Sequence, residues 1–436
     1  MIGLIMAFFL HFFEGLDLGV EARFFLQAMA SRGCIAPATT FKIKPIAKLL
    51  CLTERLVRDA VHELVEAELL VAQKQADKVG RPGQEYQASQ YLLDLLARSG
   101  RGSLDHQELI HRLFSESEIH TEGPRSEVDM RCEVAPRKLV RKDGRPAAPG
   151  AHGRLGASTR VLLASLLSFA DQCGAVAGVG EARLRAMTGL NPAALKHQVR
   201  RLASLGYIRG HVPGVSNGVF IGAKVPSTYY LNLDHPQLGE QRSRRAVLVY
   251  ADDGRSLRER VVCGLNPEVA SALLDLGPAV LNVLCHKLAR YTSHLLSLTW
   301  GGPGERYGDA PASMEGMIAR ELGQLKVSGT GLGADEYYWP GVLDHFFELA
   351  FEWAEELKEK LNGKAWSGYQ PQLIRLIPAP ERQDGLRIIS LIFYPAPERQ
   401  EGCIVYTDVR GGFLRRFDSE ADLDVRNRYE FGLLTG

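Results

Sequence analysis

The chain has 436 residues, of which 45% are hydrophobic and 24% are charged. These proportions exclude a mainly disordered, fibrous or collagen-like protein, and roughly 100–200 residues per domain suggests two to four domains. The formal net charge is +1, so any affinity for nucleic acid must come from local basic patches rather than from the field of the whole molecule.

The first 13 residues, MIGLIMAFFLHFF, are apolar. They lack the basic segment and the small-residue cleavage site of a secretory signal, and they are too short to span a bilayer. We interpret them as a buried helix or an oligomer contact, and an upstream-extended start codon is another interpretation. We expect no membrane partner.

Seven cysteines are scattered along the chain. None forms a CxxC pair, and none stands at zinc-ligand spacing from a histidine. This pattern favours reduced core thiols in a cytoplasmic protein that binds no metal.

The strongest signal is an internal duplication. The segment 50–71, LCLTERLVRDAVHELVEAELLV, aligns without a gap on the segment 188–209, TGLNPAALKHQVRRLASLGYIR. Thr53 and Asn191 coincide, and both are good helix N-caps. Apolar residues follow each cap at the spacing of one helical face. They are Val57, Val61 and Leu64 in the first copy and Leu195, Val199 and Leu202 in the second.

Similar elements surround the two copies. A shorter helix is expected before each aligned helix, over 43–50 and 180–189, and a longer one before that, around 21–30 and 158–169. A polar, Gly/Pro-rich excursion between two extended segments follows each aligned helix, and the first excursion contains Gly80-Arg81-Pro82. The order is therefore helix, helix, tight turn, helix and hairpin, twice.

This order resembles the winged helix-turn-helix of many bacterial transcription regulators, over about residues 15–95 and again 156–233. The resemblance implies that the third helix of each copy fits the major groove of double-stranded DNA, while the hairpin lies over the backbone or minor groove. Some winged helices instead dock proteins, and this alternative stays open. It is stronger for the first copy, since Glu54, Asp59 and Glu63 would face phosphates.

The candidate DNA contacts lie on the outer faces of the two third helices and on the two hairpins. They are Thr53, Arg55, Arg58, His62, Lys74, Lys78 and Arg81 in the first copy and Asn191, Lys196, His197, Arg200, Arg201 and Lys224 in the second. Arginine can grip guanine with two hydrogen bonds, whereas lysine supplies a point charge. The more basic third helix makes the second copy the better candidate for reading DNA.

The C-terminal part has a different pattern. Helices are expected over about 267–276, 278–298, 312–325 and 342–361. The octapeptides PAPERQDG and PAPERQEG then separate three β-favouring runs, which predicts a small antiparallel meander with two matching turns. We therefore expect an α+β domain with its helices first and its sheet after them.

The predicted fold class is α+β, with two winged helix-turn-helix domains and a C-terminal helical domain that ends in a small antiparallel sheet. The expected divisions are 1–98 for the first winged helix, 99–155 for a basic Pro/Gly-rich linker, 156–245 for the second winged helix and 246–436 for an oligomerisation or effector domain. The linker is expected to be poorly ordered without a partner and to add phosphate contacts.

We predict a sequence-specific, DNA-binding transcription regulator. A plasmid or phage replication initiator that binds repeated sites at an origin is the alternative, and a protein that uses its winged helices only for protein contacts is a third hypothesis. The chain has no HExxH or P-loop motif, and we expect no enzymatic activity and no cofactor. The expected partners are double-stranded DNA, a second copy of the chain, and a small-molecule or protein effector at the C-terminal domain.

Overall fold

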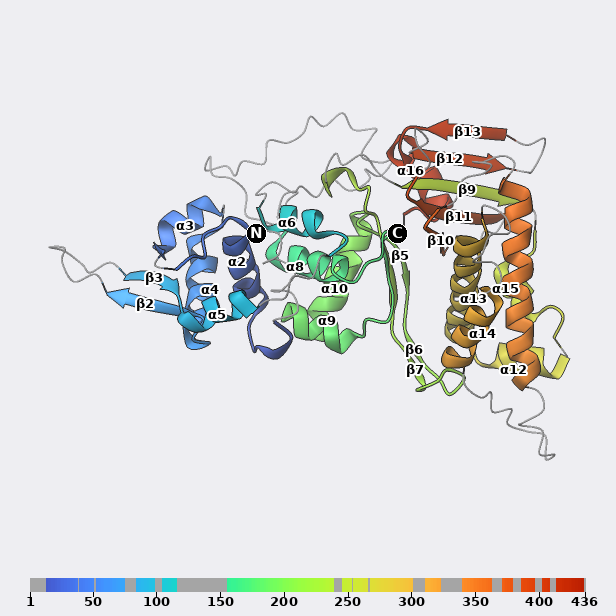
Figure 1. Cartoon of the computed structure of the whole chain (residues 1–436), viewed down its shortest axis with the longest axis horizontal. Helices are drawn as coiled ribbons and strands as arrows, with labels where there is room; N and C mark the ends of the chain where they lie inside the picture. Colours follow the sequence, from blue (N-terminus) through green and yellow to red (C-terminus); the bar gives the residue numbers. More distant parts are fainter. Residues whose placement is uncertain are drawn as a thin grey trace. The chain divides into compact units, whose positions relative to one another are not determined.

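The computed structural model is a mixed helix and sheet protein (Figure 1). It describes residues 13–37, 39–50, 52–74, 84–98, 104–115, 155–238, 245–252, 254–265, 267–300, 310–322, 339–362, 371–378, 386–396, 402–407 and 413–434. Most of the apolar N-terminal segment, the tip of the first hairpin and both PAPERQ turns lie outside these residues. The chain forms two compact units. The first unit comprises Met1–Asp171, Val179–Tyr207 and Asp234–Gly239, and the second comprises Gln172–Gly178, Ile208–Leu233 and Glu240–Gly436.

The first copy has the elements that the sequence predicts. Its elements are α2 (Val20–Ser31), β1 (Thr40–Phe41), α3 (Ile43–Leu49), α4 (Glu54–Glu66), β2 (Leu70–Lys74) and β3 (Gln84–Ala88), with the antiparallel strand order β1-β3-β2. The predicted N-cap is confirmed, since Thr53 Oγ1 accepts a hydrogen bond from the Leu56 N–H at 3.2 Å. Val57, Val61 and Leu64 are buried on one face of α4, which leaves the opposite face to solvent.

The helices of the second copy repeat this order within the same unit. They are α8 (Ala157–Leu167), α9 (Glu181–Thr188) and α10 (Pro192–Ser204). Asn191 Oδ1 accepts from the Ala194 N–H at 2.8 Å, and Pro192 occupies the first helical position, as predicted. Gly189 ends α9 at φ +70°, and a Cβ there would lie 2.5 Å from the carbonyl oxygen of Leu18. Only glycine fits this turn.

Both caps stabilise the helices proposed below to meet DNA. Thr53→Ala and Asn191→Ala are each expected to cost about 1 kcal/mol, because each leaves a backbone N–H of the first turn without its side-chain acceptor. Hydrogen exchange of the α4 and α10 amides measures the loss. Thr53→Ser is the control, since it keeps the acceptor. Equal protection in Thr53→Ala and the native chain would contradict the assigned cap.

Two further helices complete the first unit, α5 (Gln90–Arg98) and α6 (Gln107–Ser115). α6 lies inside the segment 99–155 that the sequence analysis treats as linker, so that expectation is wrong for this stretch. The apolar face of α6 is buried against α2 and α8, and the rings of Phe24 and Phe114 are 5.7 Å apart. Charged residues alternate with the apolar residues of α6, so the composition of the segment does not indicate a helix.

The duplication extends to a pair of buried arginines. Leu-Gly precedes both α2 and α8, and Arg23 and Arg160 follow four residues after the glycine. The Nε–H of Arg23 donates to the carbonyl oxygen of Leu18 at 2.7 Å, and that of Arg160 donates to Leu155 at 3.0 Å. α2 and α8 pack against each other, α2 also packs against α4, and α8 against α10. The same anchor therefore holds both copies.

The sheet of the second unit has the order β10-β11-β9-β12-β13. Its strands are β9 (Ala246–Asp252), β10 (Leu373–Ile377), β11 (Arg387–Tyr394), β12 (Gly402–Thr407) and β13 (Phe413–Phe417). β9 pairs with β12 in parallel, while the other pairs are antiparallel. The antiparallel pair β10–β11 of the predicted meander is confirmed, but β11 and β12 are not neighbours, because β9, which precedes the helices in the chain, lies between them.

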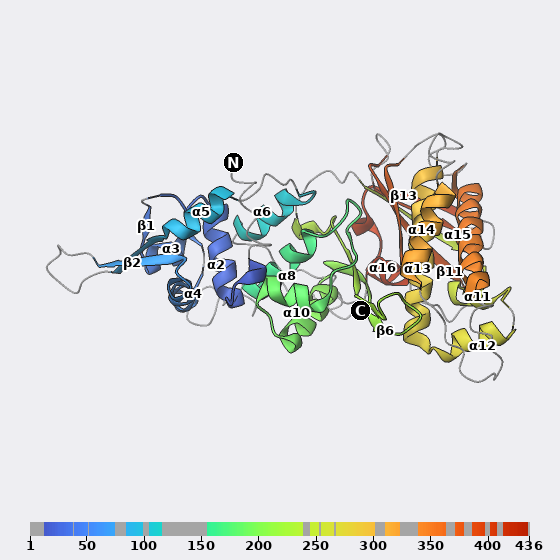
Figure 2. The same ribbon diagram turned by 60° about the horizontal axis from the view of Figure 1, so that its bottom comes forward.

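Helices cover one face of this sheet. They are α11 (Leu257–Val262), α12 (Pro267–Asp275), α13 (Pro278–Thr299), α14 (Ala310–Glu321) and α15 (Trp339–Asn362), and the short α16 (Val425–Glu430) follows the last strand. α13, α14 and α15 pack against one another, and α13 lies against β10 (Figure 2). Alternate residues of β9 enter two cores: Leu248 and Tyr250 face the helices, and Val247 and Val249 face the other side. A strand buried on both faces belongs in the middle of a sheet.

The second hairpin belongs to the second unit rather than projecting as a polar wing. Its strands are β5 (Ile208–Val212), β6 (Val215–Ser216), β7 (Lys224–Val225) and β8 (Thr228–Leu231), and β4 (Ala175–Val176) pairs with β8. Val219 and Phe220 are buried in the core that α13 and α14 share, and the Ile221 N–H donates to the carbonyl oxygen of Glu321 at 3.1 Å. The apolar residues Val219-Phe220 in this excursion explain why it packs instead of remaining solvated.

Candidate nucleic-acid interface

The outer face of α10 is basic and open to solvent. The helix sequence, PAALKHQVRRLAS, contains no carboxylate. Lys196, His197 and Arg200 are exposed, as is the cap Asn191, while Arg201 is half-buried. Within the described part of the chain, no carboxylate pairs with Lys196 or Arg200. These side chains can therefore bind an anion without first breaking an ion pair within the protein.

The outer face of α4 has a different charge pattern. Its sequence, ERLVRDAVHELVE, holds two arginines and four carboxylates. Arg55 Nε lies 3.7 Å from Asp59 Oδ2, and His62 Nδ1 lies 3.4 Å from Glu66 Oε2. Such exposed pairs one turn apart stabilise a helix by only about 0.3–0.5 kcal/mol. They nevertheless place negative charge beside each cation, which opposes the approach of a phosphate.

One carboxylate of α4, that of Glu63, has a structural role, although from the sequence this residue is expected to face DNA. Glu63 Oε1 accepts a hydrogen bond from the backbone N–H of Gly19, at the start of α2. In the second copy, Thr159 at the start of α8 donates its hydroxyl to Gln198 Oε1 of α10 at 2.7 Å. Both third helices are thus tied to the first turn of the long helix that supports them.

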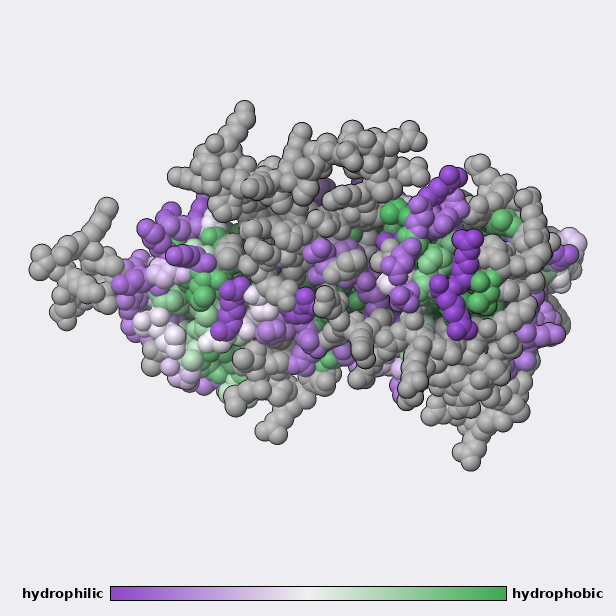
Figure 3. All heavy atoms as spheres, turned by 90° about the horizontal axis from the view of Figure 1, so that it is seen from above, coloured by the Kyte–Doolittle hydropathy of each residue, from purple (hydrophilic) through white to green (hydrophobic). Residues whose placement is uncertain are grey.

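The structure brings together only some of the predicted contacts. The predicted residues of α4 and α10 all lie in the first unit. Lys224 is exposed but belongs to the second unit. Lys78, Arg81 and the side chain of Lys74 lie outside the described residues. On the face drawn in Figure 3, hydrophilic and hydrophobic side chains are interspersed. The candidate interface is therefore defined by the exposed faces of α4 and α10.

Sequence reasoning missed the two anchoring arginines, Arg23 and Arg160. Arg23 is 2% exposed and also donates to the carbonyl oxygens of Leu16 and Ala186. Burial lowers the pKa of its guanidinium to about 10, partly offset by Glu63 and Asp17, so it stays a cation at neutral pH. The signal in the sequence was the repeated Leu-Gly-x-x-x-Arg pattern. Its two copies are one residue closer together along the chain than the two aligned helices are.

Other kinds of site are not evident in the described residues. No group of three or more histidine, cysteine or acidic side chains there could hold a metal ion. No single described helix is both long and apolar enough to cross a membrane, and one pair, α12 with α13, passes that test only across a bend of 114°.

Comparison of the chain with protein-family models, with curated proteins and with solved structures finds no match in any of the three.

Proposed function

We propose that this protein is a sequence-specific, double-stranded DNA-binding transcription regulator in which α10 is the principal recognition helix. The main support for this proposal is that Lys196, His197 and Arg200 are exposed on a helix without carboxylates. A helix of this size fits the major groove, and an arginine on its outer face can donate two hydrogen bonds to guanine O6 and N7. α2 and α8 would then form the support, and α9 with α10 the helix-turn-helix.

The first copy has a secondary role in this proposal. Arg55 and His62 each lie beside a carboxylate of α4, so this helix offers less net positive charge to a phosphate. We assign α4 weak DNA contacts or a protein contact. Its fold would serve mainly to hold α2, against which α8 and thus α10 are positioned.

A replication initiator remains the second candidate, and the duplication favours it. The Leu-Gly-x-x-x-Arg anchor repeats in both copies, as expected of tandem winged helices related by duplication. The two candidates differ in the arrangement of their DNA sites. An initiator binds iterated direct sites at an origin, whereas a regulator binds a compact site near a promoter.

Selection of bound fragments from fragmented host DNA, followed by footprinting in about 150 mM salt, separates these candidates, since salt at this level suppresses non-specific binding. A compact footprint beside a promoter is the expected result. Iterated sites beside an AT-rich origin would move the assignment to replication. No enriched sequence at all would contradict both candidates and leave the winged helices as protein-docking modules.

On the selected site, Arg200→Ala should weaken binding by about 1–3 kcal/mol and relax the preference for one base pair. The reason is the loss of a bidentate contact with a base edge. Fluorescence anisotropy with a labelled duplex measures the affinity. Arg58→Ala is the matched control on α4 and should have a smaller effect. An unchanged affinity in Arg200→Ala means that α10 does not read DNA.

A further inference from the structure

The outer faces of α4 and α10 occupy equivalent positions of the duplicated fold but differ in charge. Asp59 and Glu63 of α4 align with His197 and Arg201 of α10. α4 carries four carboxylates and two arginines, whereas α10 carries three lysine or arginine residues and no carboxylate. Both helices belong to the first unit, so each copy of the chain presents one acidic face and one basic face.

A groove of about 350 Å³ lies beside the acidic face, where the first turn of α2 meets α4. Glu21, Asp59 and Glu63 line it together with Arg55, whose side chain is 90% exposed. Glu63 already bonds the backbone of α2, whereas Glu21 is exposed and forms no ion pair within the described part of the chain. The groove therefore has room and negative charge for a cation from outside the chain.

The basic face of α10 offers cations that match this groove. Lys196 and Arg200 are four residues apart and exposed, so they project from one side of the helix. Among the described residues neither forms an ion pair, and α10 has no carboxylate that would neutralise them. Surfaces of opposite charge attract each other, and the positions of the charges fix the orientation of the contact.

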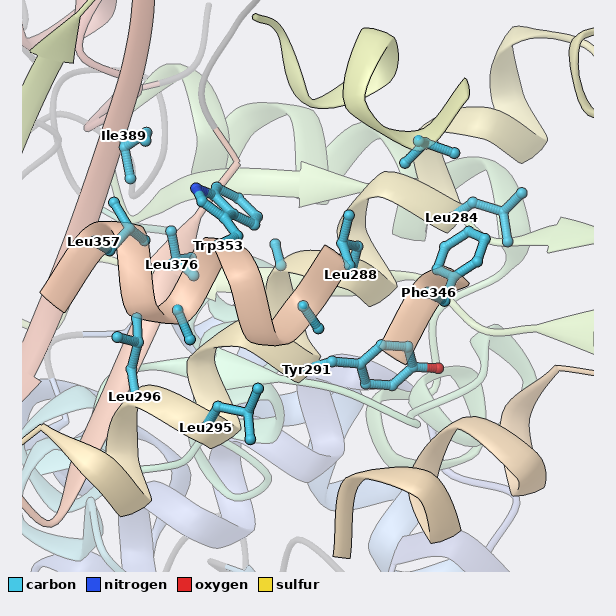
Figure 4. Packing of buried hydrophobic residues seen from close by; sticks show 14 of the residues in the cluster. Leu284, Leu288, Tyr291, Leu295, Leu296, Phe346, Trp353, Leu357, Leu376 and Ile389 are labelled. Carbon is cyan, nitrogen blue, oxygen red and sulfur yellow. The ribbon is translucent and has the colours of Figure 1, made fainter. Parts of the chain in front are cut away.

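The long helices of the second unit use their apolar side chains internally. Figure 4 shows Leu288 of α13 with Phe346 and Trp353 of α15 in one buried cluster. The large hydrophobic residues that are exposed in the described part of this unit lie in three different segments of the chain and are Ile221, Leu274 and Leu414. Single exposed hydrophobic residues are normal on a protein surface. Charge in the first unit is therefore the stronger indication of a contact between copies.

We propose that the chain associates with a second copy of itself through these faces, with Lys196 and Arg200 of one copy seated against Glu21 and Asp59 of the other. Because each copy carries both faces, the same pairing can occur twice between two copies. The contact covers the face of α10 that is proposed to read DNA, so a self-associated chain could not use that face for DNA. This last consequence rests on the proposed function, whereas the self-association does not.

Sedimentation velocity of the full-length protein, without DNA, tests the contact directly. In about 50 mM salt we expect reversible self-association, because exposed charges are weakly screened there. In about 500 mM salt the association constant should be at least about tenfold lower, since contacts between exposed charges weaken as the salt concentration rises. A protein that stays monomeric in about 50 mM salt, or that associates equally in both salts, would overturn the proposal.

Reversing the charge of each face identifies the residues in contact. Glu21→Lys/Asp59→Lys makes the groove basic, and Lys196→Glu/Arg200→Glu makes the α10 face acidic. Either variant alone should lose self-association, because like charges then meet. An equimolar mixture of the two should associate again, because each acidic face then meets a basic one. Native-like association of either variant alone, or a mixture that stays monomeric, would refute the pairing.

A matched control reverses two exposed arginines of the second unit. Arg258→Glu/Arg320→Glu changes the net charge as much as the α10 variant does, and its association should stay within about twofold of the native value. An equal loss in this control would mean that net charge, rather than the two faces, governs association.

Circular dichroism checks that each variant is folded. The four substituted side chains of the first unit are exposed, so we expect the reversed variants to fold. Glu21→Gln/Asp59→Asn replaces the reversed groove variant should that one fail to fold. It should weaken association at least about threefold, and unchanged association would count against the pairing.

Added duplex DNA separates this inference from the proposed function. Dissociation of the self-associated protein by DNA is the expected result and supports both. Association that follows the charge exchange in a protein that binds no DNA would support the contact and contradict DNA reading by α10. Loss of DNA binding in Arg200→Ala, with self-association unaffected by charge reversal, would support the proposed function and refute the contact.

Discussion

Arg387→Met is expected to destabilise the second unit by about 3–5 kcal/mol, the usual effect of removing one member of a buried ion pair. Arg387 Nε donates to Asp252 Oδ1 at 2.8 Å, and its Nη2 contacts both Asp252 and Glu356 Oε1, the latter at 2.9 Å. Asp252 is 2% exposed. Without the guanidinium, the partners of its carboxylate among the described residues are Lys360, at 3.1 Å, and the Gly254 N–H.

Tryptophan fluorescence during urea unfolding isolates this effect, because all four tryptophans of the chain lie after residue 299, in the second unit. Arg320→Met is the matched control, since Arg320 is exposed on α14. It should change the transition by less than about 0.5 kcal/mol, as surface substitutions usually do. Equal effects of the two substitutions would show that the Asp252–Arg387 pair does not hold β9 to β11.

The same pair predicts how stability depends on pH. Burial would raise the pKa of Asp252, but hydrogen bonds and charge from Arg387, with smaller contributions from Lys360 and Gly254, lower it to about 2. The folded-state pKa therefore lies below the unfolded value of 3.8. Ionised Asp252 stabilises the fold above about pH 4, and this contribution is lost as the pH falls towards 2. Arg387→Met should flatten that part of the pH profile.

Arg23→Met is expected to destabilise the first unit by about 3 kcal/mol, because it leaves one buried and two part-buried carbonyl oxygens without this donor, each costing up to about 1–3 kcal/mol. The guanidinium bridges Leu16, Leu18 and Ala186, from the start of α2 to α9 of the second copy. Lysine should not rescue the loss, since one ammonium group cannot reproduce the planar set of donors.

The duplication supplies a second test of the anchor. Arg160 donates to the carbonyl oxygens of Leu155 and Leu113, so Arg160→Met should also destabilise the first unit. Hydrogen exchange of α2 and α8, resolved by mass spectrometry, measures both effects without interference from the second unit. Arg58→Met on the exposed face of α4 is the control. If Arg23→Met proves as mild as the control, the buried arginines do not anchor the copies.

The sequence is sufficient to predict features that depend on neighbouring residues. Thr53 and Asn191 cap their helices because a short polar side chain reaches the first-turn N–H, and the apolar spacing after each cap defines the buried face. The helix over Pro278–Thr299 follows from the same local pattern. These features need no knowledge of distant contacts.

Features that depend on distant residues were missed. β9 pairs in parallel with β12, although five helices and two strands separate them along the described chain. No local sequence pattern indicates such a pair. Glu63 looks like a surface charge in its helix but bonds the N-terminus of α2. Phe220 lies in a polar excursion, yet it is buried with α13 and α14. The contact between Arg387 and Glu356 depends on α15 meeting β11, which only the folded chain shows.

DNA recognition by α10 is tested by two variants that each remove two cations, one pair from α10 and one pair from α4. Lys196→Gln/Arg200→Gln and Arg55→Gln/Arg58→Gln are assayed with the native protein on a pool of random duplexes over about 50–200 mM salt. On random duplexes both cations of α10 contact phosphates rather than one particular base. Each lost phosphate contact removes roughly 0.9, so the α10 variant should lower the slope of log affinity against log salt by about two. The α4 variant should change the slope less, and equal slopes in all three proteins would contradict DNA recognition by α10.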